Sequence, residues 1–145
     1  MKQLPYAEDV GHYWKTSQTS ADAWIDSACK VIEDMGGKVE GHAYGQSDGR
    51  GAFMLRFSIE GQSYRVVWPI LPLAFPSPAS ERATRIQAAT MLYHDVKAKA
   101  MTAAVLGERM AFFSYMELSD GHVAGEIQNE ALAEYFPKML MGAKP

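Results

Sequence analysis

The longest helical pattern in the chain covers residues 78–106, where apolar residues recur at steps of three and four. This spacing puts them on one face of an α-helix, and that face must be covered by other parts of a fold. The residues are Ile86, Ala89, Tyr93, Val96, Ala100 and Ala103. Ser77 can cap this helix, Pro78 suits its first turn, and Gly107 can end it. At about 1.5 Å per residue the helix would span about 43 Å, so we expect one end to project or to pack on another subunit.

A second helical pattern precedes the long one and runs from a Thr19 or Ser20 cap to a Gly-Gly pair at residues 36–37. The face opposite its apolar residues is acidic and carries Asp22, Asp26, Glu33 and Asp34. Such a surface repels phosphate, so a nucleic acid would have to bind elsewhere. Residues 1–18 contain Tyr and Trp but no clear period, and we expect them to form an arm that docks on the rest.

Between the two helical patterns, three stretches have the character of β-strands. Residues 38–46 form a strand weakened by Gly41 and Gly45. Residues 52–59 and 63–70 alternate apolar with polar side chains on either side of Glu60-Gly61-Gln62, which predicts a hairpin. Pro69 cannot donate to a ladder, so the third strand lies at an edge or ends there. The sequence therefore predicts three antiparallel strands.

The segment after Gly107 is ambiguous between helix and strand. We favour a helical turn that enters a short strand, a turn at residues 119–121 and a returning strand in a small hairpin. Asn129 can cap a last short helix, which Pro137 ends. The whole chain then reads as one α+β domain, residues 1–145, with an N-terminal arm (1–18) and a C-terminal cap (107–145). This order occurs in double-stranded-RNA-binding domains and in part in annealing recombinases, but the sequence motifs of neither are present.

Composition narrows the class of protein. The 145 residues are 48% hydrophobic, enough for the core of one domain, and the single cysteine excludes an internal disulfide. No stretch has the length or apolar character of a signal peptide or a membrane span, so we expect a cytoplasmic protein with no membrane association. The net charge is -3, yet residues 50–99 hold seven basic and three acidic residues, a block of +4. Such a block is typical of an anion-binding surface, although internal salt bridges give the same count.

Three segments resemble small uncharacterised proteins of phages and prophages. They are the hairpin followed by YRVVWPILP, the HDVKAK of the long helix, and AFFSYMELSDG after it. The resemblance covers about residues 52–126. It implies a mobile-element context, in which DNA replication, recombination and the countering of host defence are common tasks. It carries over no site residues.

The sequence offers no set of residues for catalysis or metal binding. The four histidines have no i, i+4 pairing and no cysteine partner at zinc spacing, and no glycine-rich phosphate loop is present. We therefore expect no enzyme activity, no metal and no cofactor. An enzyme acting on a small phosphorylated ligand is disfavoured because no acid-base or nucleophile pair can be named.

The candidate site is on one face of the predicted sheet. Strict alternation would place on that face Lys38, His42, Tyr44, Arg56 and Arg65. Cations beside an aromatic ring can follow phosphates and stack a base, as in single-strand binding platforms. The alternative is that Arg56 and Arg65 pair with Glu40 and Glu60 across strands and that this face is merely solvated.

A second candidate is the pair Arg82 and Arg85, one turn apart near the positive end of the long helix, where an anion would be favoured. Both arginines could equally bond Glu81 or a neighbouring subunit. Our leading hypothesis is an oligomeric, non-catalytic protein that binds single-stranded DNA in annealing or recombination. The alternative is a protein-interaction or host-defence inhibitor module without nucleic-acid binding, suggested by the acidic total and by nine Met, seven Tyr and three Trp residues.

Overall fold

The computed structural model describes residues 3–47 and 50–125. Its elements in chain order are η1 (Ala7–Asp9), α1 (Ala21–Asp34), β1 (Lys38–Ser47), β2 (Arg50–Ile59), β3 (Gln62–Pro69), α2 (Pro78–Leu106), α3 (Glu108–Ala111) and η2 (Phe113–Tyr115). The strands form an antiparallel sheet in the order β1-β2-β3. The predicted α+β class and element order are confirmed. Asn129 and the last predicted helix lie outside the described residues.

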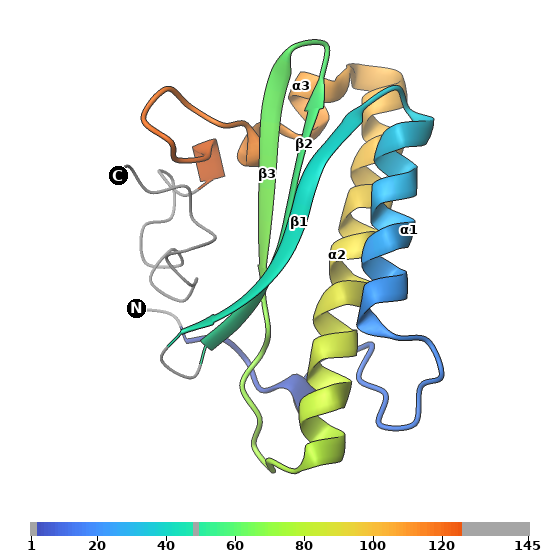
Figure 1. Ribbon diagram of the computed structural model, residues 1–145, viewed down its shortest axis with the longest axis vertical. Helices are drawn as coiled ribbons and strands as arrows, with labels where there is room; N and C mark the ends of the chain where they lie inside the picture. Colours follow the sequence, from blue (N-terminus) through green and yellow to red (C-terminus); the bar gives the residue numbers. More distant parts are fainter. Residues whose placement is uncertain (1–2, 48–49, 126–145) are drawn as a thin grey trace.

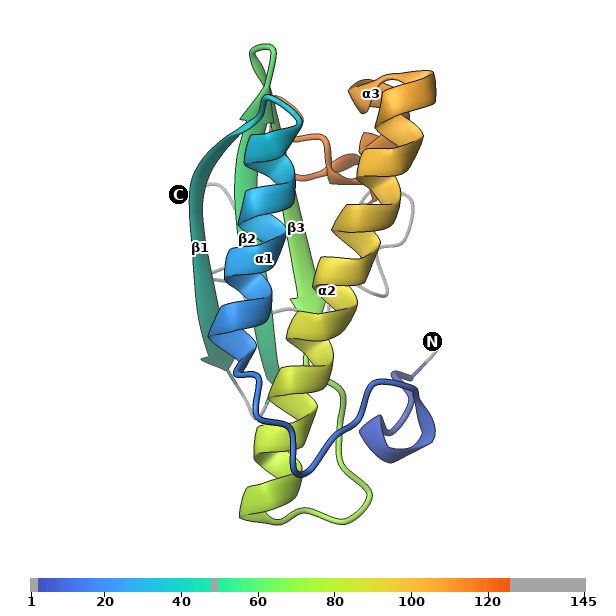
Figure 2. The same cartoon turned by 90° about the vertical axis from the view of Figure 1, so that its right-hand side faces the viewer.

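Helices α1 and α2 cover the same face of the sheet, and residues 116–125 lie on the opposite side (Figure 1). Seen from the helical side, α1 and α2 lie in front of the strands (Figure 2). Ser20 caps α1 by accepting the amide of Ala23, and Ser77 caps α2 by accepting the amide of Ser80. Gly107 follows the last residue of α2 with a φ of 92°, a conformation that favours glycine. These local signals fix both helices where the sequence predicts them.

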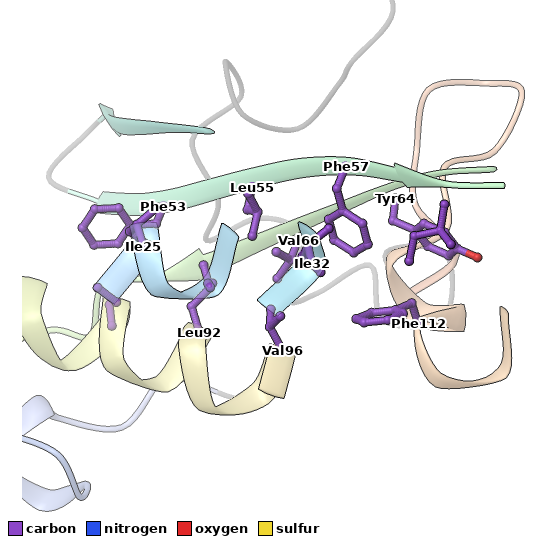
Figure 3. Packing of buried hydrophobic residues seen from close by; sticks show 14 residues of the cluster. Ile25, Ile32, Phe53, Leu55, Phe57, Tyr64, Val66, Leu92, Val96 and Phe112 are labelled. Carbon is purple, nitrogen blue, oxygen red and sulfur yellow. The ribbon is translucent and has the colours of Figure 1, made fainter. Parts of the chain in front are cut away.

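The core lies between the sheet and the helices, because alternate side chains of β2 and β3 point toward α1 and α2 (Figure 3). Buried side chains from the strands are Phe53, Leu55, Phe57, Ile59, Tyr64 and Val66. Those from the helices are Ile25, Ala28, Ile32, Ile86, Ala89, Leu92 and Val96. Phe112 closes one end of the core against Phe57 and Tyr64, with ring centroids 5.2 and 5.7 Å away. Among the described helices, none combines the length and the apolar content needed to cross a bilayer.

A β-bulge in β1 changes which side chains share a face. Val39 pairs with Phe57 and Gly41 pairs with Arg56, so Glu40 is an extra residue with no partner position of its own. Beyond the bulge every side chain of β1 lies on the face opposite to the one that strict alternation gives. His42 therefore pairs with Leu55, and Tyr44 with Phe53, on the helical side. The expectation that His42 and Tyr44 share a face with Arg56 and Arg65 is wrong for this reason.

The N-terminal arm docks on α2 and on the connection that leads into it. The amide of Ala7 donates to the carbonyl of Pro72 at 2.8 Å, and Ala7 is fully buried. The buried side-chain amide of Gln87 donates to the carbonyls of Ala7 at 2.9 Å and Gly11 at 3.1 Å. The carboxylate of Glu8 accepts two backbone amides of the connection. These bonds hold the arm across the first half of α2.

After α3 and η2 the chain reaches the free edge of β3. Met116 forms a bridge with Tyr64, and the amide of Glu117 donates to the carbonyl of Ser63 at 2.9 Å. Glu117 also forms a bridge with Val123 around the turn at residues 119–121. The predicted small hairpin is thus present as single bridges, and its place at the sheet edge positions Glu117 over the outer face.

Candidate functional site

The outer face of the sheet, opposite the helices, carries a cluster of two arginines and one carboxylate. Glu117 accepts two hydrogen bonds from Arg56, from Nε at 2.7 Å and from Nη2 at 3.0 Å. The Nη1 of Arg65 lies 3.7 Å from the same carboxylate, and its Nη2 donates to the carbonyl of Gly121 at 3.0 Å. The hydrogen bond to Glu117 raises the pKa of Arg56. The paired arrangement expected as the alternative is present, but the carboxylate comes from the C-terminal segment rather than from Glu40 or Glu60.

The members of this cluster differ in burial. The side chain of Arg65 is 6% exposed and that of Glu117 16%, whereas that of Arg56 is 44% exposed. A buried guanidinium held by a carboxylate and a carbonyl has a structural role, because its charge is not available to a ligand in solvent. Only Arg56 retains an accessible cationic surface.

The remaining residues of the expected platform do not assemble around Arg56. Lys38 pairs with Ser58 and shares the outer face, but Tyr44 is on the helical side, where its ring lies 5.4 Å from that of Phe53. The outer face therefore combines Lys38, Arg56 and Arg65 with no stacking ring from Tyr44. On α2, Arg82 donates to the carbonyl of Ser17 at 2.8 Å and holds the arm, while Arg85 is exposed.

Two further clusters were not foreseen as groups. Asp95 accepts a hydrogen bond from the hydroxyl of Tyr115 and pairs with Lys99 at 3.0 Å, which ties the C-terminal segment to α2. Burial is the main cause that raises the pKa of Tyr115, with the nearby Asp95 second. The i, i+4 spacing of Asp95 and Lys99 is readable from the sequence, but Tyr115 is 20 residues away.

The other cluster gathers aromatic rings where the arm meets both helices. The ring of His94 lies 5.0 Å from that of His12 and 5.9 Å from that of Trp24. Desolvation, followed by the charge of His12, lowers the pKa of His94. A shallow cleft of about 310 Å³ beside this cluster is lined by Trp14, Thr16, Ser17 and Trp24. The rings pack the arm onto α1 and α2, which gives the cluster a structural role.

A group of exposed apolar side chains lies at the C-terminal end of α2 and in the two short helices that follow it. Five side chains there are between 50% and 82% exposed: Met101, Val105, Leu106, Met110 and Phe113. We call this group the apolar end surface. Its residues come from the end of α2, from α3 and from η2, and Figure 2 shows the end of α2 and α3 together at the top of the molecule. From residue 100 to residue 107 the sequence has no charged side chain.

Comparisons with protein-family models, with curated proteins and with solved structures find no match to this chain. The resemblance to phage proteins accordingly stays a prediction. Within residues 3–47 and 50–125, no three side chains of His, Cys, Asp or Glu are placed to hold a metal ion together.

Proposed function

We propose that the protein acts as a protein-interaction module and that it binds its partner through the apolar end surface. The observation that carries the proposal is the exposure of Met101, Val105, Leu106, Met110 and Phe113 at one end of the molecule. Side chains of this kind each offer on the order of 100 Å² of apolar area, so the surface amounts to roughly 500 Å². A contiguous patch of several hundred Å² is typical of interaction sites.

The side chains of this surface suit an interface. Met101 and Met110 are flexible and polarizable and can adapt to the shape of a partner, and Phe113 supplies a large aromatic area. Their burial on binding would be favourable by about 1.5 to 3 kcal/mol for each fully buried side chain. A polyanion is less favoured, because α1 is acidic and Arg65 and Arg82 are engaged within the fold.

The experiment places a photoreactive phenylalanine analogue at Met110 in cells that express the protein. Irradiation is expected to give one discrete covalent product, which is absent from cells kept in the dark. The matched control carries the analogue at Glu33, an exposed position on α1, and is expected to give no such product. A product of twice the chain's mass identifies a second copy, and a product of another mass identifies a different protein. No product beyond the Glu33 control would refute the proposed function.

A second candidate function is the binding of single-stranded DNA, in annealing or recombination. One observation favours it: the side chain of Arg56 is 44% exposed and the exposed Lys38 shares its face of the sheet, so two cations are accessible there. Binding of a labelled oligonucleotide would be measured by fluorescence anisotropy at several salt concentrations. Arg56→Ala with Lys38→Ala should weaken binding and reduce the salt slope by about 0.7 for each lost phosphate contact, whereas Lys30→Ala on α1 should not. Absence of binding at low salt would exclude this candidate.

A further inference from the structure

The last two turns of α2 combine three properties that together point to a particular partner. Residues 100–106 carry no charge, most of them are exposed, and they include the small exposed residue Ala104. Small residues allow the backbones of two helices to approach closely, and the larger Met101 and Val105 are one turn apart on the same face. We propose that the apolar end surface packs against the same surface of a second copy of this chain, forming a two-fold symmetric dimer. The inference rests on the proposed function and names its partner.

Charge is the first argument for a second copy. A two-fold interface places the same patch against itself, so any net charge in the patch would face like charge. The chain as a whole has a net charge of -3, and the exposed side of α1 is acidic, so two copies would repel each other there. Residues 100–107 are free of this penalty. Charged side chains flank the segment, with Lys97 and Lys99 before it and Glu108 and Arg109 after it, so they would lie at the rim of the contact.

Area is the second argument. Roughly 500 Å² of apolar surface on each copy gives about 1,000 Å² in a symmetric contact, before any polar rim is counted. Chance contacts mostly bury less than about 800 Å², and specific interfaces begin near 1,000 to 1,200 Å². The surface is thus large enough for a dimer at the weak end of the specific range, which sets the concentrations to be tested at micromolar and above.

The decisive experiment is sedimentation equilibrium of the purified full chain from about 1 to 200 µM. The wild-type protein is expected to pass from monomer to dimer over this range, with no larger species. Val105→Glu and Met101→Glu each place a charge in the contact, and a residue at the centre of an interface is commonly worth 2 kcal/mol or more, so each should weaken dimerisation by about 30-fold or more. Ala23→Glu, the same charge at an exposed position of α1, should leave the association constant unchanged.

A second measurement separates loss of association from loss of folding. The thermal midpoint of a dimer rises with protein concentration, so the wild-type and Ala23→Glu midpoints should rise and the Val105→Glu midpoint should not. Val105 is 82% exposed, and a glutamate there fits without disturbing the core. A wild-type chain that stays monomeric at 200 µM, or a dimer that Val105→Glu and Met101→Glu leave intact, would overturn the inference. If the Met110 product then proves to be a different protein, the proposed function stands without the dimer.

Discussion

The strongest test of the outer face is the substitution Glu117→Gln, which removes the charge that holds two arginines. Breaking a buried ion pair by neutralising one partner commonly costs about 3 to 5 kcal/mol, because the other charge stays buried and uncompensated. An exposed pair is worth only about 0.2 to 1 kcal/mol. Arg65 is nearly buried and Arg56 is not, so the cost arises mainly at Arg65. The 3.7 Å separation is loose, the amide can still accept a hydrogen bond, and Arg65 retains other contacts such as the carbonyl of Gly121, so we expect a smaller loss of about 2 kcal/mol.

The free energy of unfolding would be measured by urea denaturation at pH 7, followed by far-ultraviolet circular dichroism. Arg56→Ala removes the exposed partner and should cost only about 1 kcal/mol. Glu33→Gln makes the same chemical change on the exposed face of α1 and should stay within about 0.5 kcal/mol of wild type.

Two results would contradict this reasoning. Glu117→Gln could prove no more destabilising than Glu33→Gln, in which case the cluster is only a surface contact. Alternatively, Arg56→Ala could cost as much as Glu117→Gln, which would mean that the exposed pair, and not the buried guanidinium of Arg65, dominates.

Three further predictions concern the residue that precedes β1, the docking of the arm and the C-terminal segment. Gly37→Ala puts a methyl group as near as 2.7 Å to side-chain atoms and should lower the free energy of unfolding in urea by about 1 to 3 kcal/mol. Gly41→Ala meets nothing within 4 Å and should cost less. Equal costs for the two variants would refute the claim that close packing requires glycine at position 37. The amide of Ala74 is the main cause that lowers the pKa of Glu8, so the contribution of Glu8 to arm docking should be fully present above the usual glutamate pKa of 4.5 and be lost as pH falls through the lower folded pKa. Protection of the Ala74 amide from hydrogen exchange, taken relative to the intrinsic exchange rate at each pH, should fall in this way in the wild type but not in Glu8→Gln. Tyr115→Phe should lower the free energy of unfolding by about 2 kcal/mol near neutral pH. The pKa of Tyr115 is raised in the folded state, so above pH 10 the phenol ionises only in the unfolded wild type, and the difference in stability between the two proteins should shrink. A difference that stays constant with pH would argue against a neutral buried phenol.

The helices could be predicted from the sequence because their limits are set by local chemistry. Ser77 accepts an amide three residues ahead, and Gly107 adopts a conformation that glycine favours, so both ends of α2 depend only on near neighbours. The sheet order followed from two short turns in the same way. What failed was the face assignment in β1, because Glu40 adds one residue to the strand. Gly41 carried the available signal, since a glycine inside a strand often marks a bulge.

The partner of the two arginines could not be predicted. Glu117 lies 61 residues from Arg56, and no periodicity joins them. Its position depends on Met116 reaching the free edge of β3. A long-range contact of this kind follows from the packing of a segment whose own secondary structure was ambiguous in the sequence. The sequence could therefore indicate that a carboxylate would pair with these arginines, but not which carboxylate.

A basic block spread over several elements and an uncharged stretch within one helix therefore differ in how well they predict a surface. The basic block of residues 50–99 is contiguous in sequence, but folding sends its charges to separate places: Arg65 to the outer face, Arg82 to the arm and Lys99 to Asp95. Charges spread over strands and loops form a surface patch only if the fold brings them onto one face. Residues 100–106 belong to one helix, so their uncharged side chains stay together whatever the rest of the chain does. For this reason the uncharged end of the long helix is a better guide to a partner than the charge of the central block.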